Sequence, residues 1–218
     1  MTPLSRRFLF SLLLTALLAL ARTAHADGLQ DLETFLREVQ SGQAQFTQVV
    51  TSPVRAGETV ARSRTSRGQF EFLRPNRFRF EYTQPFEQTI VADGQTLWLY
   101  DADLNQVTAR AQQAALGSTP AALIAAGTDL RALSQAFDLK AAPAQNGLSW
   151  LDARPRAQDS TLLAVRVGFR QGQLAALEIT DSLGQRSVLS FGQWQSNLPL
   201  KAERFRFQVP AGADVIRP

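Results

Sequence analysis

The side chains that most often do chemistry in proteins are scarce in this 218-residue chain. There is no cysteine, and the single histidine and single methionine are His25 and Met1. Residues 27–218 therefore lack the groups for a thiolate nucleophile, a histidine-based triad or a His/Cys zinc site. Asp101 and Asp103 resemble an acid/base pair, but turn formation explains both side chains. We expect a binding protein that is no enzyme and uses neither a metal nor a cofactor.

Residues 1–26 have the pattern of a secretory signal peptide. Arg6 and Arg7 form a basic start, an apolar run of 14 residues covers 8–21, and an Ala-His-Ala cleavage site ends the segment. The run is shorter than the roughly 20 residues of a membrane-spanning helix. We therefore expect cleavage and an exported mature chain of 192 residues, 27–218, that forms a single domain.

The charge of the mature part gives no support for a nucleic-acid partner. Three of the 23 basic residues and none of the 19 acidic residues lie within 1–26, so the remainder is close to neutral. Seven arginines lie within residues 55–79. Two interpretations of this run stay open: a solvated face of a sheet, or a surface that steers docking onto an acidic partner.

Apolar periodicity predicts one helix followed by many strands. Helical spacing covers 27–41, with Gly42 as the expected stop. From there to about residue 110 the period is two, which predicts half-buried antiparallel strands with Asp93-Gly94 as a tight hairpin turn. Further strands are expected at 137–141, 148–153, 162–169, 173–180, 188–194 and 205–209.

A helical segment interrupts the strands in the middle of the chain. Thr119-Pro120 is an N-cap followed by proline, 121–126 is a short apolar helix, and a second helix is expected at 129–136. A sheet of about 11 strands must curl, and its concave apolar face must be covered. We expect a mainly β (α+β) fold, an unclosed antiparallel barrel with an N-terminal helix and a mid-chain helical lid. The pattern alone leaves open whether helices fill an ordinary core or close an apolar cavity.

A series of short motifs runs in order along residues 27–218. The motifs are Phe46-Thr47-Gln48, Gly68-Gln69-Phe70, Arg74-Pro75-Asn76-Arg77-Phe78-Arg79-Phe80, Gln84-Pro85, the segment 91–101, Gln106-Val107-Thr108, Thr119-Pro120, Phe205-Arg206-Phe207 and the segment 210–215. No single motif is specific, but the ordered set resembles the LolA family of periplasmic carriers of outer-membrane lipoproteins.

The resemblance implies a function, a location and partners. It implies a periplasmic chaperone, expected to be monomeric, that accepts acylated lipoproteins from an inner-membrane ABC transporter. The acyl chains would lie in an apolar cavity until the lipoprotein reaches an outer-membrane receptor similar to LolB. That receptor carries a lipid-modified cysteine, which this chain lacks. The sequence therefore resembles the soluble carrier and not the receptor.

The resemblance also implies roles for individual residues. Arg74 corresponds to an arginine that reaches inward and holds the lid closed by hydrogen bonds to backbone groups. The lid's apolar underside would be Ala122, Leu123 and Ile124. The expected cavity and acyl-chain residues are Leu32, Phe35, Phe46, Phe70, Phe72, Phe78, Phe80 and Trp98.

Three functions compete with that of a carrier. One is a periplasmic lipid-binding sensor or regulatory protein of the same fold, which usually needs a second domain. Another is a hydrolase working through carboxylates, for which no convergent acidic pair is visible. The last is a structural protein, which predicts a closed, dry core.

Overall fold

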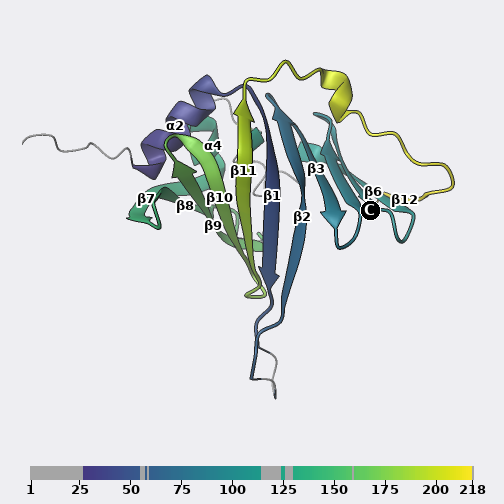
Figure 1. Cartoon of the computed structure of the whole chain (residues 1–218), viewed down its shortest axis with the longest axis horizontal. Helices are drawn as coiled ribbons and strands as arrows, with labels where there is room; N and C mark the ends of the chain where they lie inside the picture. Colours follow the sequence, from purple (N-terminus) through teal and green to yellow (C-terminus); the bar gives the residue numbers. More distant parts are fainter. Residues whose placement is uncertain are drawn as a thin grey trace, which may run out of the picture.

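The computed structural model describes residues 27–54, 57, 59–113, 124–125, 130–158 and 160–217. These residues form one strongly twisted sheet of twelve strands with two open edges (Figure 1). The strands are β1 (Ser41–Thr51), β2 (Ser63–Leu73), β3 (Arg77–Gln84), β4 (Gln88–Ala92), β5 (Thr96–Asp101), β6 (Gln106–Ala111), β7 (Phe137–Gln145), β8 (Leu148–Pro155), β9 (Leu162–Arg170), β10 (Gln173–Asp181), β11 (Arg186–Ser196) and β12 (Asp214–Ile216). The helices are α2 (Gly28–Glu38), α4 (Leu130–Ala136) and the 3-10 helix η2 (Ala202–Phe205).

The strand order is β12-β6-β5-β4-β3-β2-β1-β11-β10-β9-β8-β7. Pairing of β1 with β11 joins two antiparallel meanders into one sheet, and only the short β12 lies parallel to its neighbour, β6. The predicted mainly β, unclosed architecture with an N-terminal helix is confirmed. Strand β12 is an addition to the eleven expected strands. Among the described residues, no helix is long and apolar enough to span a membrane.

Two sequence predictions about elements are wrong, one on the existence of a strand and one on the end of helix α2. The segment 205–209 is not a strand, because Phe205 ends η2 and its ring packs onto the sheet with no exposed surface. The helix ends at Glu38 and not at Gly42, since Val39 already has extended geometry. Gly42 belongs to β1, where it faces the rings of Phe72 and Trp194.

Helix α2 lies against the concave side of the sheet, over β7, β8 and β9 (Figure 1). Its first turn is capped by Asp27, whose carboxylate accepts a hydrogen bond from the Gln30 amide at 2.8 Å. The buried Asp31 carboxylate accepts a hydrogen bond from the Ser149 hydroxyl. A Cβ at position 28 would collide with the Trp150 carbonyl group, so only glycine allows this close approach. These contacts fix the position of the helix on β8.

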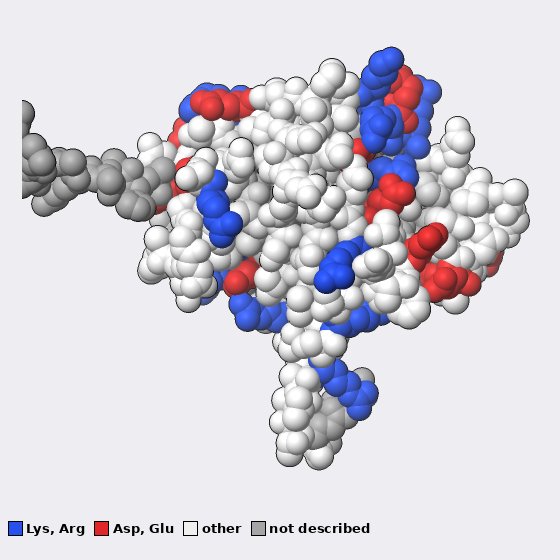
Figure 2. Space-filling view, viewed as in Figure 1, with Lys and Arg blue, Asp and Glu red and all other residues white. Residues whose placement is uncertain are grey.

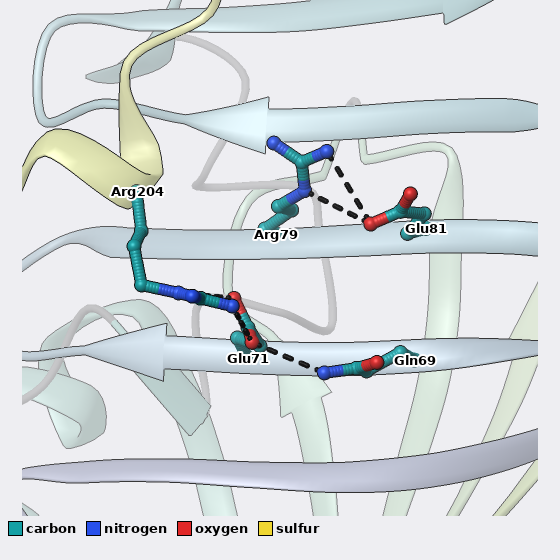
Figure 3. Close-up of polar contacts among 5 residues, drawn as sticks. All are labelled: Gln69, Glu71, Arg79, Glu81 and Arg204. Carbon is teal, nitrogen blue, oxygen red and sulfur yellow. Dashed lines mark hydrogen bonds and ion pairs between the residues drawn. The ribbon is translucent and has the colours of Figure 1, made fainter. Parts of the chain in front are cut away.

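The convex face is crossed by the C-terminal segment 197–213, which carries η2 (Figure 1). Arg204 on η2 makes a bidentate ion pair with Glu71 on β2, with N···O distances of 2.5 and 3.2 Å (Figure 3). The Glu71 side chain is only 4% exposed, and its hydrogen bond raises the pKa of Arg204. Further along, the Phe207 ring stacks on Trp98 at 5.3 Å. An ion pair and an aromatic contact thus hold this segment against the sheet.

The ion pair predicts unequal effects of its two partners. Arg204→Ala leaves the buried Glu71 carboxylate without its counter-charge, so we expect a loss of about 1–3 kcal/mol in the free energy of unfolding. Glu71→Gln keeps an acceptor and should cost less. Urea unfolding measures both, with the exposed Lys201→Ala as the control. An Arg204→Ala loss no larger than that of Lys201→Ala would contradict the role of the pair.

The close approach of α2 to β8 predicts a specific cost for a methyl group. Gly28→Ala should destabilise the protein by about 1–3 kcal/mol through overpacking, although alanine is the better helix former. Gln30→Ala, on the exposed side of the same turn, should change stability by less than about 0.5 kcal/mol. Thermal unfolding compares the two variants, and equal melting temperatures would refute the close packing of Gly28 against Trp150.

Candidate functional site

The centre of the concave face is a wall of aromatic rings on β1, β2 and β3. We call its five members the phenylalanine wall: Phe46, Phe70, Phe72, Phe78 and Phe80. They come from alternate positions of the three strands, and strand pairing places them side by side. Each is at most 7% exposed, and the Phe70 and Phe80 ring centres lie 4.5 Å apart. The structure therefore brings together five of the eight predicted cavity residues on one surface.

Two further predicted residues, Leu32 and Phe35, project from α2 into the same cluster. Leu32 is 1% exposed, and the Phe35 ring lies 6.0 Å from that of Phe72. Ile124 and Ala125 of the mid-chain segment also pack there and are almost fully buried. Helical side chains thus fill the space over the phenylalanine wall in this conformation. Of the predicted lid residues, Ile124 lies in the interior, whereas Ala122 and Leu123 lie outside the described residues.

Trp98 lies on the opposite face from the other predicted cavity residues. Its neighbour Leu97 belongs to the interior cluster, whereas Trp98 points outward, stacks on Phe207 and donates a hydrogen bond to the Asp93 carboxylate at 2.9 Å. Both faces of β5 are covered, one by the interior and one by the C-terminal segment. The expected placement of Trp98 on the cavity side is therefore wrong.

Arg74 lies in the turn between β2 and β3, at the point where this turn meets the end of α2. Its Nε donates to the Val39 carbonyl at 2.8 Å, and its backbone amide donates to the Gln40 carbonyl at 2.8 Å. The guanidinium lies over the rings of Phe35 and Phe72, at 5.2 and 5.3 Å. This residue is only 6% exposed. The side chain thus contacts both the covering helix and the wall beneath it.

The charge of Arg74 persists in this buried place. Burial lowers the pKa of Arg74 to about 10, so the group stays protonated at neutral pH. A buried cation needs hydrogen-bond acceptors, and helix ends offer carbonyl groups that lack partners within the helix. The geometry suits a residue that ties a helix end to the wall.

The same turn also contacts the mid-chain segment. The Asn76 amide donates to the Ala125 carbonyl at 3.0 Å, and the Gln112 side chain donates to the Asn76 carbonyl at 2.7 Å. Asn76 has a positive φ of 64°, which asparagine tolerates better than most residues. Sequence reasoning did not assign roles to Asn76 or Gln112. The Pro75-Asn76 pair after an arginine was the signal of a turn that could have indicated them.

A group of polar side chains borders the phenylalanine wall on the side of the β1–β2 loop. We call it the polar band: Gln48, Tyr82 and Ser187. The Tyr82 hydroxyl donates to Gln48 at 2.9 Å, and the Gln48 amide donates to Ser187 at 2.6 Å. Desolvation by burial raises the pKa of Tyr82 to about 12, against a smaller opposite effect of Arg64. No separate role for Gln48 or Tyr82 followed from the sequence.

Beyond the polar band, the concave face opens into a hollow of about 820 Å³. Gln48 and Tyr82 line it on the inner side, and Arg64, Asp101 and Phe86 line it further out. Asp101 accepts a hydrogen bond from the Leu104 amide, so it builds a turn as expected. Among the described residues, no cluster of His, Cys, Asp or Glu could hold a metal ion.

The arginine run does not form one patch on the described surface. Arg74 is buried, Arg79 pairs with Glu81 at 3.3 Å on the convex face, and Arg64 lies at the hollow. Figure 2 shows few charges over the front of β1 and β11, while charged side chains of both signs gather around η2. This distribution favours solvated positions over a single docking patch.

Known proteins are similar to this chain in sequence or in fold. The profile of the family described as Outer membrane lipoprotein carrier protein LolA matches residues 37–208. Proteins named outer-membrane lipoprotein carrier protein from Albidiferax ferrireducens and Methylibium petroleiphilum are 60% and 51% identical over 203 residues. These alignments cover 91% and 93% of this chain and 95% and 96% of the relatives. The crystal structure of an uncharacterized conserved protein from Thermus thermophilus shares the fold, with a TM-score of 0.50 and 16% identity over 87% of this chain and 97% of that one. The chain therefore belongs to the LolA family of outer membrane lipoprotein carrier proteins.

Proposed function

We propose that this protein is a carrier, and not an enzyme, that shields the acyl chains of lipoproteins on the phenylalanine wall. The supporting observation is that this wall is an apolar concave surface covered by helical side chains, Leu32 and Phe35 from α2 and Ile124 from the mid-chain segment. Family membership supports the same function. The carrier acts by binding and release, with no bond made or broken.

The described interior is closed, so cargo has to exchange places with the covering side chains. Each methylene that leaves water stabilises the bound state by about 0.8 kcal/mol. Acyl chains that replace Leu32, Phe35 and Ile124 on the wall would therefore restore the burial lost when these residues move away. The exchange needs no nucleotide, because apolar surface is covered in both states.

Arg74 is proposed to act as the latch of this exchange. Its hydrogen bond to Val39 and its position over the Phe35 ring connect α2 to the wall, and Asn76 in the same turn holds Ala125. Charge-assisted hydrogen bonds of this kind contribute about 1.5–3 kcal/mol each. That is enough to bias the protein toward the closed state and small enough for bound acyl chains to overcome.

The proposal includes the route and the partners. Residues 1–26 would direct export and be removed, leaving residues 27–218 as one carrier domain in the periplasm. Cargo would come from an inner-membrane ABC transporter and pass to an outer-membrane receptor similar to LolB. Direct transfer between two apolar surfaces is required, because free acyl chains in water would lose all of their burial energy.

Mass spectrometry of the purified protein tests the carrier function. The mature protein, expressed with its signal in a bacterium that makes lipoproteins, should retain acylated polypeptides. Adding it to spheroplasts should release lipoproteins into the supernatant. A protein that retains no acylated molecule and releases none would refute the function, whereas turnover of acyl esters would favour the hydrolase.

Arg74→Leu tests the latch. Loss of its charge-assisted contacts should shift the closed–open equilibrium toward the open state by more than about tenfold. The variant should still take up cargo but pass it to receptor-containing membranes much more slowly. Arg77→Leu, at the start of β3 and partly exposed, is the control. Handover by Arg74→Leu at the rate of the control would exclude the latch role.

A further inference from the structure

On β1, β2 and β3, the concave face changes from apolar to polar along the strands. Interior positions of β1, β2 and β3 that pair across the sheet form rows two residues apart. The rows that contain Phe72 and Phe70 are apolar, and the next row pairs Phe46 with Gly68 and Gly68 with Tyr82. The row after that contains Gln48. The phenylalanine wall therefore has a defined length.

That length matches a membrane acyl chain. From Phe72 to Gly68, which pairs with Phe46, the wall extends over four residues of β2, or about 14 Å at about 3.4 Å per residue. The hydrocarbon core of a bilayer is about 30 Å thick and contains two chains end to end, so one chain accounts for about 15 Å. A chain aligned with the strands covers the wall and ends near the polar band.

The hydrogen bonds of the polar band oppose the entry of an alkyl chain beyond the phenylalanine wall. Its hydroxyl and amide groups are connected by hydrogen bonds from Tyr82 to Gln48 and from Gln48 to Ser187. The Tyr82 ring packs edge-on against Phe46 at 4.9 Å, so it belongs to the wall while its hydroxyl belongs to the band. An alkyl chain that advanced past this level would separate these polar groups from their partners without offering any replacement.

We propose that the polar band of Gln48, Tyr82 and Ser187 sets the length of acyl chain that the carrier accommodates. This inference rests on the proposed function, because it takes the phenylalanine wall as the acyl-chain surface. Chains up to the length of the wall gain affinity with every methylene. Longer chains gain nothing more, since their ends meet the polar band or the charged hollow beyond it, where Arg64 and Asp101 lie.

Affinity measured against chain length tests the proposal. The probes are synthetic lipopeptides with one peptide and saturated acyl chains of increasing length, both shorter and longer than a typical membrane chain. For wild type, affinity should rise about fourfold per methylene in each chain and then reach a plateau. In Gln48→Leu/Tyr82→Phe, which removes the polar groups but keeps the ring, the plateau should move to longer chains.

Two further variants keep the test decisive. Gln45→Leu lies on the same strand but on the exposed convex side, and it should leave the plateau where it is in wild type. Tyr82→Phe alone removes one hydroxyl and should move the plateau in the same direction by a smaller amount, even where the double variant folds poorly. A plateau at one length in all variants, or no plateau in wild type, would overturn the proposal. Lipopeptides that fail to bind at any length would overturn the carrier function itself.

Discussion

The structure depends on one constraint: a strongly curved sheet presents five phenylalanine rings on its concave face, and these rings must be kept from water. Burying a ring of this size contributes about 1.5–3 kcal/mol, so exposing all five would cost on the order of 10 kcal/mol. That is comparable to the whole stability of a typical domain. The wall therefore has to be covered at all times. An empty, open state would be costly, and a covering element can leave only as another apolar group arrives.

The rest of the fold holds that cover in place without making it permanent. Helix α2 lies on β8 through Gly28 and Asp31, at the end of the helix far from Arg74. The turn that contains Arg74 contacts the other end of α2 and also holds Ala125. One end of the helix is thus fixed by close packing and the other by a few polar contacts. On the convex side, the Arg204–Glu71 ion pair and the C-terminal segment brace β2 from behind, so the wall keeps its shape while its cover changes.

Period-two alternation made most of the sheet predictable, because β1, β2 and β3 are apolar toward the interior and polar outside. The same signal failed where both faces are covered. Val91 and Ala92 are adjacent on β4 and point to opposite faces, yet both are fully buried. They pair with Trp98 and Leu97 on β5, so the pattern of apolar residues could not assign Trp98 to a face. Phe205 and Phe207 alternate as in a strand, yet they pack on the sheet from a segment that crosses it. The inward position of Arg74 followed from family resemblance alone, since an arginine before a proline is usually solvated.

Photo-crosslinking from the phenylalanine wall shows whether acyl chains bind there. The residue p-benzoylphenylalanine would be placed at Phe80, in the phenylalanine wall, and separately at Trp98, which faces the convex side. After uptake of an acylated lipoprotein and illumination, mass spectrometry locates the bond. We expect an adduct between position 80 and the acyl chain, and none from position 98. Bound cargo whose acyl chains crosslink at position 98, or at neither position, would contradict this expectation.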